Sequence, residues 1–443
     1  MKRVIIIGAA GRDFFNFLTV FRDDPTVRVV AFTAQQIPHI AERQFPAELA
    51  GPAYPDGIPI FPESRLEELI HRLGADECVL SYSDLSAETV LSLAARVNAA
   101  GADFRLLGNQ HVLHSSKPVI AVTASRTGAG KSPLSRAIVP WLRHMGVQVA
   151  VIRHPMPYGD LVAGRLQRFA SFEDLDRHKV TLEEREEYEP HLASGSIVYA
   201  GVDYAAILAA AEKEADVILW DGGNNDTSFI AADIYLCVVD PHRAGHEASF
   251  YPGQTNVRLA DVVVINKVDT APPDQVAAVR DNVRRMNPSA RIVLAECPVT
   301  VADPTVLKGR TVLAIDDGPT LTHGGMAFGA AVLAARVCGA KDLANPRAFA
   351  VGEIAAALET DTHVRESLPA LGYGEAQVKD LEATIARAVA GGVEAIAIGT
   401  PIDLAKLVKL PVPSTRVSYD LRLLHVTLSE LLEPVLPIVP AAV

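Results

Sequence analysis

The residues with the clearest chemistry lie in one glycine-rich run, Ser125-Arg-Thr-Gly-Ala-Gly-Lys-Ser132. The run follows a β-branched apolar segment at 119–123 and precedes a helical pattern at 133–145, which is the strand–turn–helix setting of a P-loop. Glycines let backbone N–H groups turn inward around a phosphate, the lysine can reach the phosphate oxygens, and the final hydroxyl is placed for Mg²⁺. The expected nucleotide phosphate site is Ser125, Arg126, Thr127, Gly128, Ala129, Gly130, Lys131 and Ser132.

One position departs from the P-loop pattern G-x-x-x-x-G-K-[ST]. Ser125 stands where the pattern has its first glycine, and serine can replace that glycine only if its φ is negative. The departure weakens the match without removing it. Arg126 is unusual inside such a loop and would add a positive charge near the phosphates.

Two further motifs follow in the order of a P-loop NTPase. The apolar run 217–220 ends in Asp221, which predicts an acid that holds Mg²⁺ together with Ser132. The run 262–265 leads into Asn266-Lys267-Val-Asp269, a pattern whose aspartate binds guanine in GTPases. We therefore expect ATP or GTP with Mg²⁺, a nucleotide site completed by these N-K-x-D residues, and catalysis by Lys131, Arg126 and Asp221.

Basic and hydroxyl side chains elsewhere could bind the phosphate or carboxylate groups of a small anionic substrate. Some follow predicted strands, where open α/β sheets bind ligands, and others open predicted helices. A structural tight turn at Gly8–Gly11 and a plain capped helix after residue 323 are equal alternatives for two of these places. The candidates are Arg12, Arg153, His154, Arg243, His246, Thr322 and His323.

Other ligand classes are disfavoured. The Gly8-Ala-Ala-Gly11 turn lacks the G-x-G-x-x-G spacing, and the second strand ends without an acid for a ribose hydroxyl, so no dinucleotide is expected. Gly245 interrupts the His242-x-x-x-His246 spacing, and no further ligand follows at a typical distance, which argues against zinc. The acidic run Glu173–Glu189 is expected to be a solvated helix face.

Composition narrows the protein classes further. The chain of 443 residues is 49% apolar and 21% charged, as in globular proteins, and is long enough for several domains. Its net charge of -12 argues against nucleic-acid binding. Apolar runs are far shorter than the ~20 residues of a membrane span, and the four cysteines lie far apart. We expect a cytoplasmic protein with neither nucleic-acid nor membrane partners.

The alternation of strand and helix patterns predicts an α/β fold with parallel sheets. We expect an N-terminal Rossmann-like domain at 1–113, a P-loop NTPase domain at 114–315 and a smaller α/β domain at 316–443. The stretch Phe45–Pro62 contains five prolines and is expected to be irregular.

Several motifs together resemble cyclic 2,3-diphosphoglycerate synthetase: the Gly8–Asp13 turn, the P-loop Arg126–Lys131, the stretch 183–188 leading to Val198–Asp203, Trp220–Asp226 and Asp317–Gly325. The resemblance spans nearly the whole chain in the same order. It implies an ATP-dependent, Mg²⁺-requiring cytoplasmic enzyme, typically a homodimer. Its substrate would be 2,3-bisphosphoglycerate, closed to a cyclic pyrophosphate with release of ADP and Pi.

The residues also leave other functions open. The N-K-x-D pattern favours guanine, so a P-loop GTPase acting as a switch or metallochaperone is an alternative, as is an NTP-dependent kinase or ligase on another anionic acceptor. Against the GTPase stand N- and C-terminal segments large enough to build a substrate pocket, and the absence of a Cys/His metal-handling tract.

Overall fold

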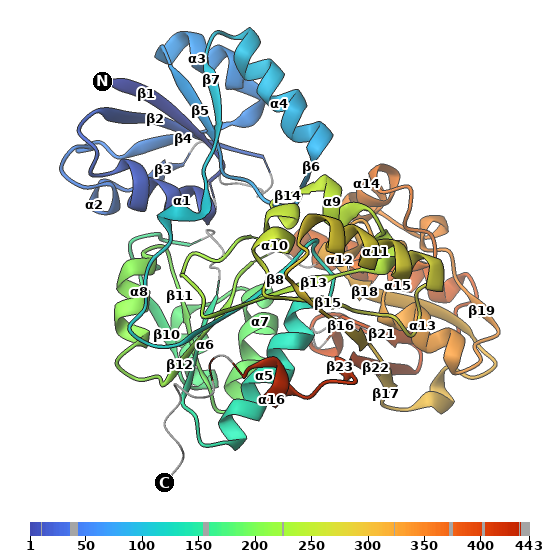
Figure 1. Cartoon of the computed structure of the whole chain (residues 1–443). Helices are drawn as coiled ribbons and strands as arrows, with labels where there is room; N and C mark the ends of the chain where they lie inside the picture. Colours follow the sequence, from blue (N-terminus) through green and yellow to red (C-terminus); the bar gives the residue numbers. More distant parts are fainter. Residues whose placement is uncertain are drawn as a thin grey trace.

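The computed structural model describes residues 1–9, 11–35, 43–153, 159–223, 226–322, 324–371, 375–400, 404–433 and 435. Within these residues the chain forms three lobes, each built on a largely parallel sheet with helices packed against it (Figure 1). The α/β fold class expected from the sequence is confirmed. Of the helices in the described ranges, none is both long and apolar enough to cross a membrane.

The N-terminal lobe has the strand order β3-β4-β2-β1-β5-β7. Its strands are β1 (Lys2–Ile7), β2 (Val27–Ala34), β3 (Gln44–Phe45), β4 (Ile58–Pro62), β5 (Glu77–Leu80) and β7 (Asp103–Leu106). Helices α1 (Arg12–Asn16), α2 (Ala47–Ala50), α3 (Leu66–Leu73) and α4 (Ala87–Ala99) flank them, and a π-helical turn, Phe17–Phe21, continues α1.

The expectation of an irregular stretch at Phe45–Pro62 is wrong. This stretch contains α2 and β4, and β4 pairs in parallel with β2. Ile58 and Ile60 alternate with proline along β4 and are almost fully buried. Burial of these apolar side chains therefore overrides the local preference of proline against strands.

The central lobe has the strand order β10-β11-β9-β12-β8-β13-β15-β16-β23. The strands are β8 (Val119–Ala124), β9 (Val149–Arg153), β10 (Gln167–Phe169), β11 (Ile197–Ala200), β12 (Val217–Asp221), β13 (Ile234–Val239), β15 (Val262–Ile265), β16 (Arg291–Glu296) and β23 (Arg422–Leu424). The helices are α5 (Lys131–His144), α6 (Phe172–His178), α7 (Leu182–Ala193), α8 (Tyr204–Ala211), α9 (His246–Ser249), α10 (Gly253–Leu259) and α11 (Pro273–Met286). Strands β8, β12 and β13 are buried along their whole length, because separate cores cover the two faces of the sheet.

The C-terminal lobe has the strand order β17-β22-β21-β18-β19, with β20 also paired to β18. Its strands are β17 (Val299–Val301), β18 (Thr311–Asp317), β19 (Asp342–Leu343), β20 (Ser367–Ala370), β21 (Ala395–Ile398) and β22 (Ser414–Tyr419). Its helices are α12 (Gly318–Leu321), α13 (Ala330–Val337), α14 (Gly352–Thr360) and α15 (Glu375–Ala390).

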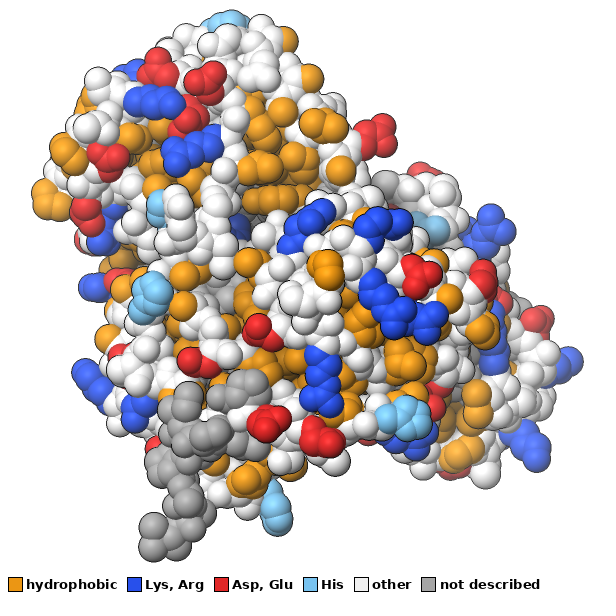
Figure 2. Space-filling view, in the orientation of Figure 1, with side chains coloured by type: hydrophobic (Ala, Val, Ile, Leu, Met, Phe, Trp, Pro, Cys, Tyr) orange, Lys and Arg blue, Asp and Glu red, His pale blue; other side chains and the backbone are white. Residues whose placement is uncertain are grey.

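The chain crosses twice between the central and C-terminal lobes. The expected boundary at residue 315 falls inside β18. After β22 the chain returns, because β23 pairs antiparallel with β16 of the central sheet and α16 (Leu428–Leu431) packs on the core of that lobe. On the face shown in Figure 2, acidic and basic side chains are interspersed over the lobes, so the net negative charge is not gathered into one patch there.

An aromatic cluster joins the N-terminal and central lobes. Phe15 of the N-terminal lobe stacks on Phe229 with their ring centroids 4.2 Å apart. The rings of Tyr204 and Trp220 also pack against Phe229, with centroid distances of 4.7 and 4.6 Å. A short two-stranded sheet, β6 (Leu85–Ser86) with β14 (Phe250–Tyr251), makes a second connection between these lobes.

We predict that Phe229→Ala destabilises the protein by about 3–5 kcal/mol, because it removes a fully buried ring and leaves a cavity in the aromatic cluster. The midpoint of urea unfolding, followed by circular dichroism, measures the effect. Phe172→Ala, which truncates a largely exposed ring, is the control. An unchanged midpoint for Phe229→Ala would contradict the prediction.

Candidate functional site

The glycine-rich run has the geometry of a P-loop between β8 and α5. Gly128 and Gly130 have φ of +77° and +116°, in the region that favours glycine. Ser125 is not among the described residues with a positive φ, so the condition for serine at this position is met. Its N–H donates to the carbonyl of Val238 on β13 at 2.9 Å, which continues the sheet into the loop.

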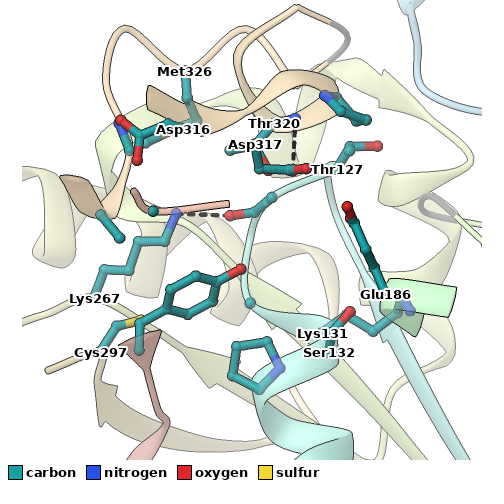
Figure 3. Close-up of a pocket in the computed structure, with 18 of the residues that line it drawn as sticks. Thr127, Lys131, Ser132, Glu186, Lys267, Cys297, Asp316, Asp317, Thr320 and Met326 are labelled. Carbon is teal, nitrogen blue, oxygen red and sulfur yellow. Dashed lines mark hydrogen bonds between the residues drawn. The ribbon is translucent and has the colours of Figure 1, made fainter. Parts of the chain in front are cut away.

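A cavity of about 260 Å³ opens above this loop and extends to the C-terminal lobe (Figure 3). The P-loop and the first turns of α5 form one wall. The opposite wall is formed by Asp316 and Asp317 at the end of β18 and by Thr320 of α12, which follows it. Lys267 and Cys297 lie on one side, and Glu186 of α7 lies on the other. The carboxyl ends of the central and C-terminal sheets therefore share one space, as expected for a ligand site of open α/β sheets.

Asp221 is the centre of a buried charged cluster beside the P-loop lysine. Its carboxylate accepts from Lys131 Nζ at 2.5 Å and pairs with the Arg153 guanidinium at 2.6 Å. His191 Nε2 lies 3.2 Å from the same carboxylate, and Glu187 forms an ion pair with the far side of Arg153. Burial alone would raise the pKa of Asp221, but the charges of Arg153 and Lys131 hold that pKa well below its usual value.

Burial lowers the pKa of two of the groups that contact Asp221, Lys131 and His191. For Lys131 the desolvation outweighs the attraction of Asp221, and for His191 it outweighs the hydrogen bond to the same carboxylate. His191 is therefore neutral near pH 7, whereas Asp221 is ionised. The cluster places a carboxylate and a partly desolvated ammonium group where a nucleotide phosphate would enter.

The N-K-x-D residues brace the P-loop from the next strand end. Asn266 donates from Nδ2 to the carbonyl of Ala129 at 3.0 Å, and Lys267 donates from Nζ to the carbonyl of Gly128 at 2.7 Å. Lys267 also pairs with Asp240 at 2.7 Å. Asp269 is exposed and accepts from the backbone N–H of Cys297 at 3.1 Å.

Arg126 and Arg243 bind protein groups at the tip of the P-loop. Arg126 pairs through Nε with Asp84 at 2.6 Å, contacts His246 Nδ1 at 2.5 Å and donates to the carbonyl of Gly324 at 3.1 Å. Arg243 pairs with Asp240 at 2.9 Å and donates to the carbonyl of Thr127 at 2.8 Å. Both guanidinium groups are buried and join the loop to its surroundings.

Of the residues expected to bind a small anionic substrate, the structure brings some together near the P-loop and leaves others apart. Arg153 lines the cavity next to Asp221, and His246 lies behind Arg126. Thr322 donates to the carbonyl of Gly318 within its own turn. Arg12 instead contacts Asp226 and Thr227 and lies over the ring of Phe229. The two remaining candidates, His154 and His323, lie outside the described residues.

The structure bears on two other features weighed from the sequence, the Gly8 turn and the His242/His246 pair. At the Gly8 turn the carboxylate of Asp13 lies 2.8 Å from where a Cβ of Gly8 would be, so the space beside the turn already holds a negative group. This geometry agrees with the structural alternative, a tight turn. His242 and His246 also have different partners, because His242 Nε2 contacts Thr270 at 2.9 Å while His246 contacts Arg126.

The expectation that Glu173–Glu189 forms a solvated helix face is wrong for part of α7. Glu186 and Glu187 line the cavity, and His191, one turn after Glu187, reaches Asp221. The spacing of Glu187 and His191 by four residues puts both on one face of a helix, which was an available signal. Sequence reasoning also missed Asp240, Asp316 and Asp317, although each ends or follows an apolar strand as Asp221 does.

Part of the central lobe is similar to a known family of nucleotide-binding domains. Residues 208–294 match the family described as the CobW/HypB/UreG nucleotide-binding domain. The crystal structure of LpxK from Aquifex aeolicus in complex with ATP aligns with a TM-score of 0.43 and 14% identity, covering 84% of this chain and 99% of that one. The P-loop, the acid at the end of β12 and the matched domain define a nucleotide-dependent enzyme of the P-loop class.

Two relatives are informative about the family. Arginine synthetase ArcE of Thermococcus kodakarensis is 53% identical over 421 residues, covering 95% of this chain and 93% of the relative. The chain belongs to the family of this synthetase, and it is an NTP-dependent synthetase. Cyclic 2,3-diphosphoglycerate synthetase of Thermococcus sibiricus is 22% identical over 254 residues, covering 52% of this chain and 57% of that protein. The resemblance drawn from the motifs is therefore to a related, more distant P-loop synthetase.

We predict that Gly130→Ala abolishes nucleotide binding while the protein stays folded. A Cβ at this residue would lie 2.1 Å from Asn266 Nδ2, and the φ of +116° is unfavourable for alanine. Fluorescence titration with a labelled ATP analogue measures binding. Gly309→Ala, at a positive φ with open space around it, controls for the strain alone. Normal binding by Gly130→Ala would contradict this view of the loop.

A second prediction concerns pH. Burial, assisted by Arg126 and Arg243, lowers the pKa of His246 from 6.5 to about 4. Between pH 6.5 and 4 the unfolded chain binds more protons at His246 than the folded chain does. The free energy of unfolding therefore decreases as the pH falls through this range. We expect His246→Asn to flatten the dependence of the urea midpoint on pH between 6.5 and 4. Parallel curves for variant and wild type would refute this assignment.

Proposed function

We propose that this protein is an ATP-dependent arginine synthetase that joins citrulline and ammonia, releasing ADP and Pi. The observation that carries the proposal is the 53% identity to arginine synthetase ArcE over nearly the whole of both chains. A P-loop site activates an oxygen by phosphoryl transfer. Citrulline has an oxygen where arginine has a nitrogen on the same carbon, so it is the precursor that such activation converts into arginine.

The reaction balances in two steps. The ureido oxygen attacks the γ-phosphorus, a new P–O bond forms and ADP leaves. Ammonia, formed from ammonium by loss of a proton, then attacks the ureido carbon, and the C–O bond breaks with its electrons leaving on phosphate. The products are arginine, with a protonated guanidinium, ADP and Pi.

The P-loop would stabilise the transferring phosphoryl group. Gly128, Gly130, Lys131 and Ser132 line the cavity, and Lys131 with the backbone N–H groups of the loop would stabilise the charge that develops on the phosphate. Desolvation strengthens these interactions, because the field of a partly buried lysine is less screened than in water. Binding of a nucleotide would exchange the contact between Lys131 and Asp221 for one between Lys131 and phosphate.

Ser132 and Asp221 would hold Mg²⁺ together with phosphate oxygens. A hydroxyl and a carboxylate are oxygen donors that Mg²⁺ prefers, and the low pKa of Asp221 keeps that carboxylate charged. When bound, the ion would neutralise charge on the β- and γ-phosphates. Arg153 and His191 would keep the carboxylate in place from behind.

The charges around the cavity favour arginine synthesis over the second candidate, synthesis of cyclic 2,3-diphosphoglycerate. That candidate is supported by the distant relative of 22% identity. A bisphosphate acceptor needs several available cations, but Arg126, Arg153 and Arg243 form ion pairs with carboxylates. In contrast, Glu186 lines the cavity and would attract ammonium and the developing guanidinium, whereas the carboxylate of Glu187 pairs with Arg153. Assembly as a homodimer, implied by the resemblance, stays part of the proposal.

We expect the protein to form arginine from citrulline, ammonium and Mg·ATP, with one ADP and one Pi for each arginine. Citrulline labelled with ¹⁸O at the ureido group should transfer that oxygen to Pi, detected by the isotope shift in ³¹P NMR. Lys131→Ala should lower the rate by on the order of 10²–10³-fold. The same spectra with 2,3-bisphosphoglycerate test the second candidate. A cyclic pyrophosphate signal without arginine formation would refute the proposal.

The preference for adenine or guanine in the nucleotide is tested separately. Asp269, the residue that would select guanine, does not line the cavity, whereas Cys297, Val299, Phe328 and Tyr419 do. These weakly polar side chains would suit an adenine ring. We expect kcat/KM for ATP to exceed that for GTP by at least about tenfold. Asp269→Asn should leave this ratio unchanged, and a preference for GTP that Asp269→Asn removes would support the GTPase alternative.

A further inference from the structure

The N-terminal lobe touches the P-loop directly, through one aspartate. Asp84 follows β5 and its side chain is 5% exposed. One carboxylate oxygen accepts from Arg126 Nε at 2.6 Å, and the other accepts from the backbone N–H of Thr127 at 3.3 Å. Two consecutive residues of the nucleotide loop therefore depend on a side chain from another lobe.

The backbone at Asp84 is held in an unfavourable conformation. Its φ is +62°, in the left-handed region that residues other than glycine rarely adopt. Aspartate tolerates this region better than most residues, and such outliers cluster at functional sites. At Asp84 the outlier coincides with the turn that aims the carboxylate at the P-loop.

Arg126 also contacts residues of the central and C-terminal lobes. The guanidinium of Arg126 lies over the ring of Phe250, 3.6 Å from its centroid, and contacts His246 of the central lobe. Phe250 belongs to β14, which pairs with β6 immediately after Asp84. Arg126 also donates to the carbonyl of Gly324 from the C-terminal lobe.

We propose that Asp84 is a positioning residue for nucleotide binding, through which the N-terminal lobe holds the first half of the P-loop in its binding conformation. Residues 126–127 precede the turn at Gly128 that cradles phosphate. A loop already ordered before binding loses less conformational entropy on binding. The N-terminal lobe would thus set the nucleotide affinity without contacting the nucleotide. This inference rests on the proposed nucleotide site and not on the identity of the acceptor.

The dissociation constant of a fluorescent methylanthraniloyl-ATP, measured without citrulline or ammonium, tests the proposal. We expect Asp84→Gly, which removes the carboxylate while accepting a positive φ, to weaken binding by about tenfold. Asp84→Asn keeps an acceptor but loses the charge, so an increase of about threefold is expected. His425→Gly replaces an exposed residue with a φ of +60° far from the P-loop in sequence, and should bind as the wild type does.

A double-mutant cycle separates positioning from general loss of structure. Because Asp84 holds both Arg126 and the N–H of Thr127, the loss of affinity in the double variant Asp84→Gly/Arg126→Met should be smaller than the sum of the two single losses. Circular dichroism identifies the variants that fold, and Asp84→Asn carries the test if Asp84→Gly does not fold. Wild-type affinity in either folded Asp84 variant, or full additivity in the cycle, would overturn the proposal.

The proposed function can fail independently. A wild-type protein that binds the ATP analogue but makes no arginine refutes the acceptor and leaves the Asp84 test intact. A wild-type protein that does not bind the analogue overturns the nucleotide site, and the proposal for Asp84 with it.

Discussion

The buried carboxylate of Asp221 is the interaction on which the site depends. A charge with no exposure to water is tolerated only because Lys131, Arg153 and His191 surround it. Lys131 belongs to α5, Arg153 to β9 and His191 to α7. One charged cluster therefore fixes these three elements relative to the P-loop. A nucleotide phosphate can replace Asp221 as the partner of Lys131. The carboxylate of Asp221 then still has Arg153 as its partner.

The P-loop is also the place where the three lobes meet. Gly128 faces Thr320 of the C-terminal lobe so closely that a Cβ would lie 2.7 Å from its methyl group, and Gly253 allows α10 to approach the carbonyl of Ser125. Asp84 adds the contact from the N-terminal lobe. The nucleotide loop is thus braced on several sides, and the cavity above it is closed by a different sheet from the one that carries it. That arrangement suits transfer of a phosphoryl group to a second substrate held by another lobe.

The distribution of charge follows the same logic. Most cations near the loop are neutralised by carboxylates, as with Arg126 and Asp84 or Arg243 and Asp240. Lys131 contacts a carboxylate that a phosphate can replace, and α7 adds the carboxylates of Glu186 and Glu187 to the lining of the cavity. A site of this composition suits a nucleotide together with a cationic or neutral partner better than two polyanions.

The sequence by itself determined the α/β class, most of the buried strands and the P-loop, because these depend on local patterns: continuous apolar runs, and glycines that permit a positive φ. It also identified the relation to P-loop synthetases through the order of the motifs. Only the tertiary structure decided what Arg126 and Arg153 contact, that α7 turns carboxylates toward the cavity, and that β4 forms despite its prolines. Those outcomes depend on residues far apart in the chain, such as Asp84 with Arg126 or His191 with Asp221, and no local pattern encodes which side chain fills the space beside a buried charge.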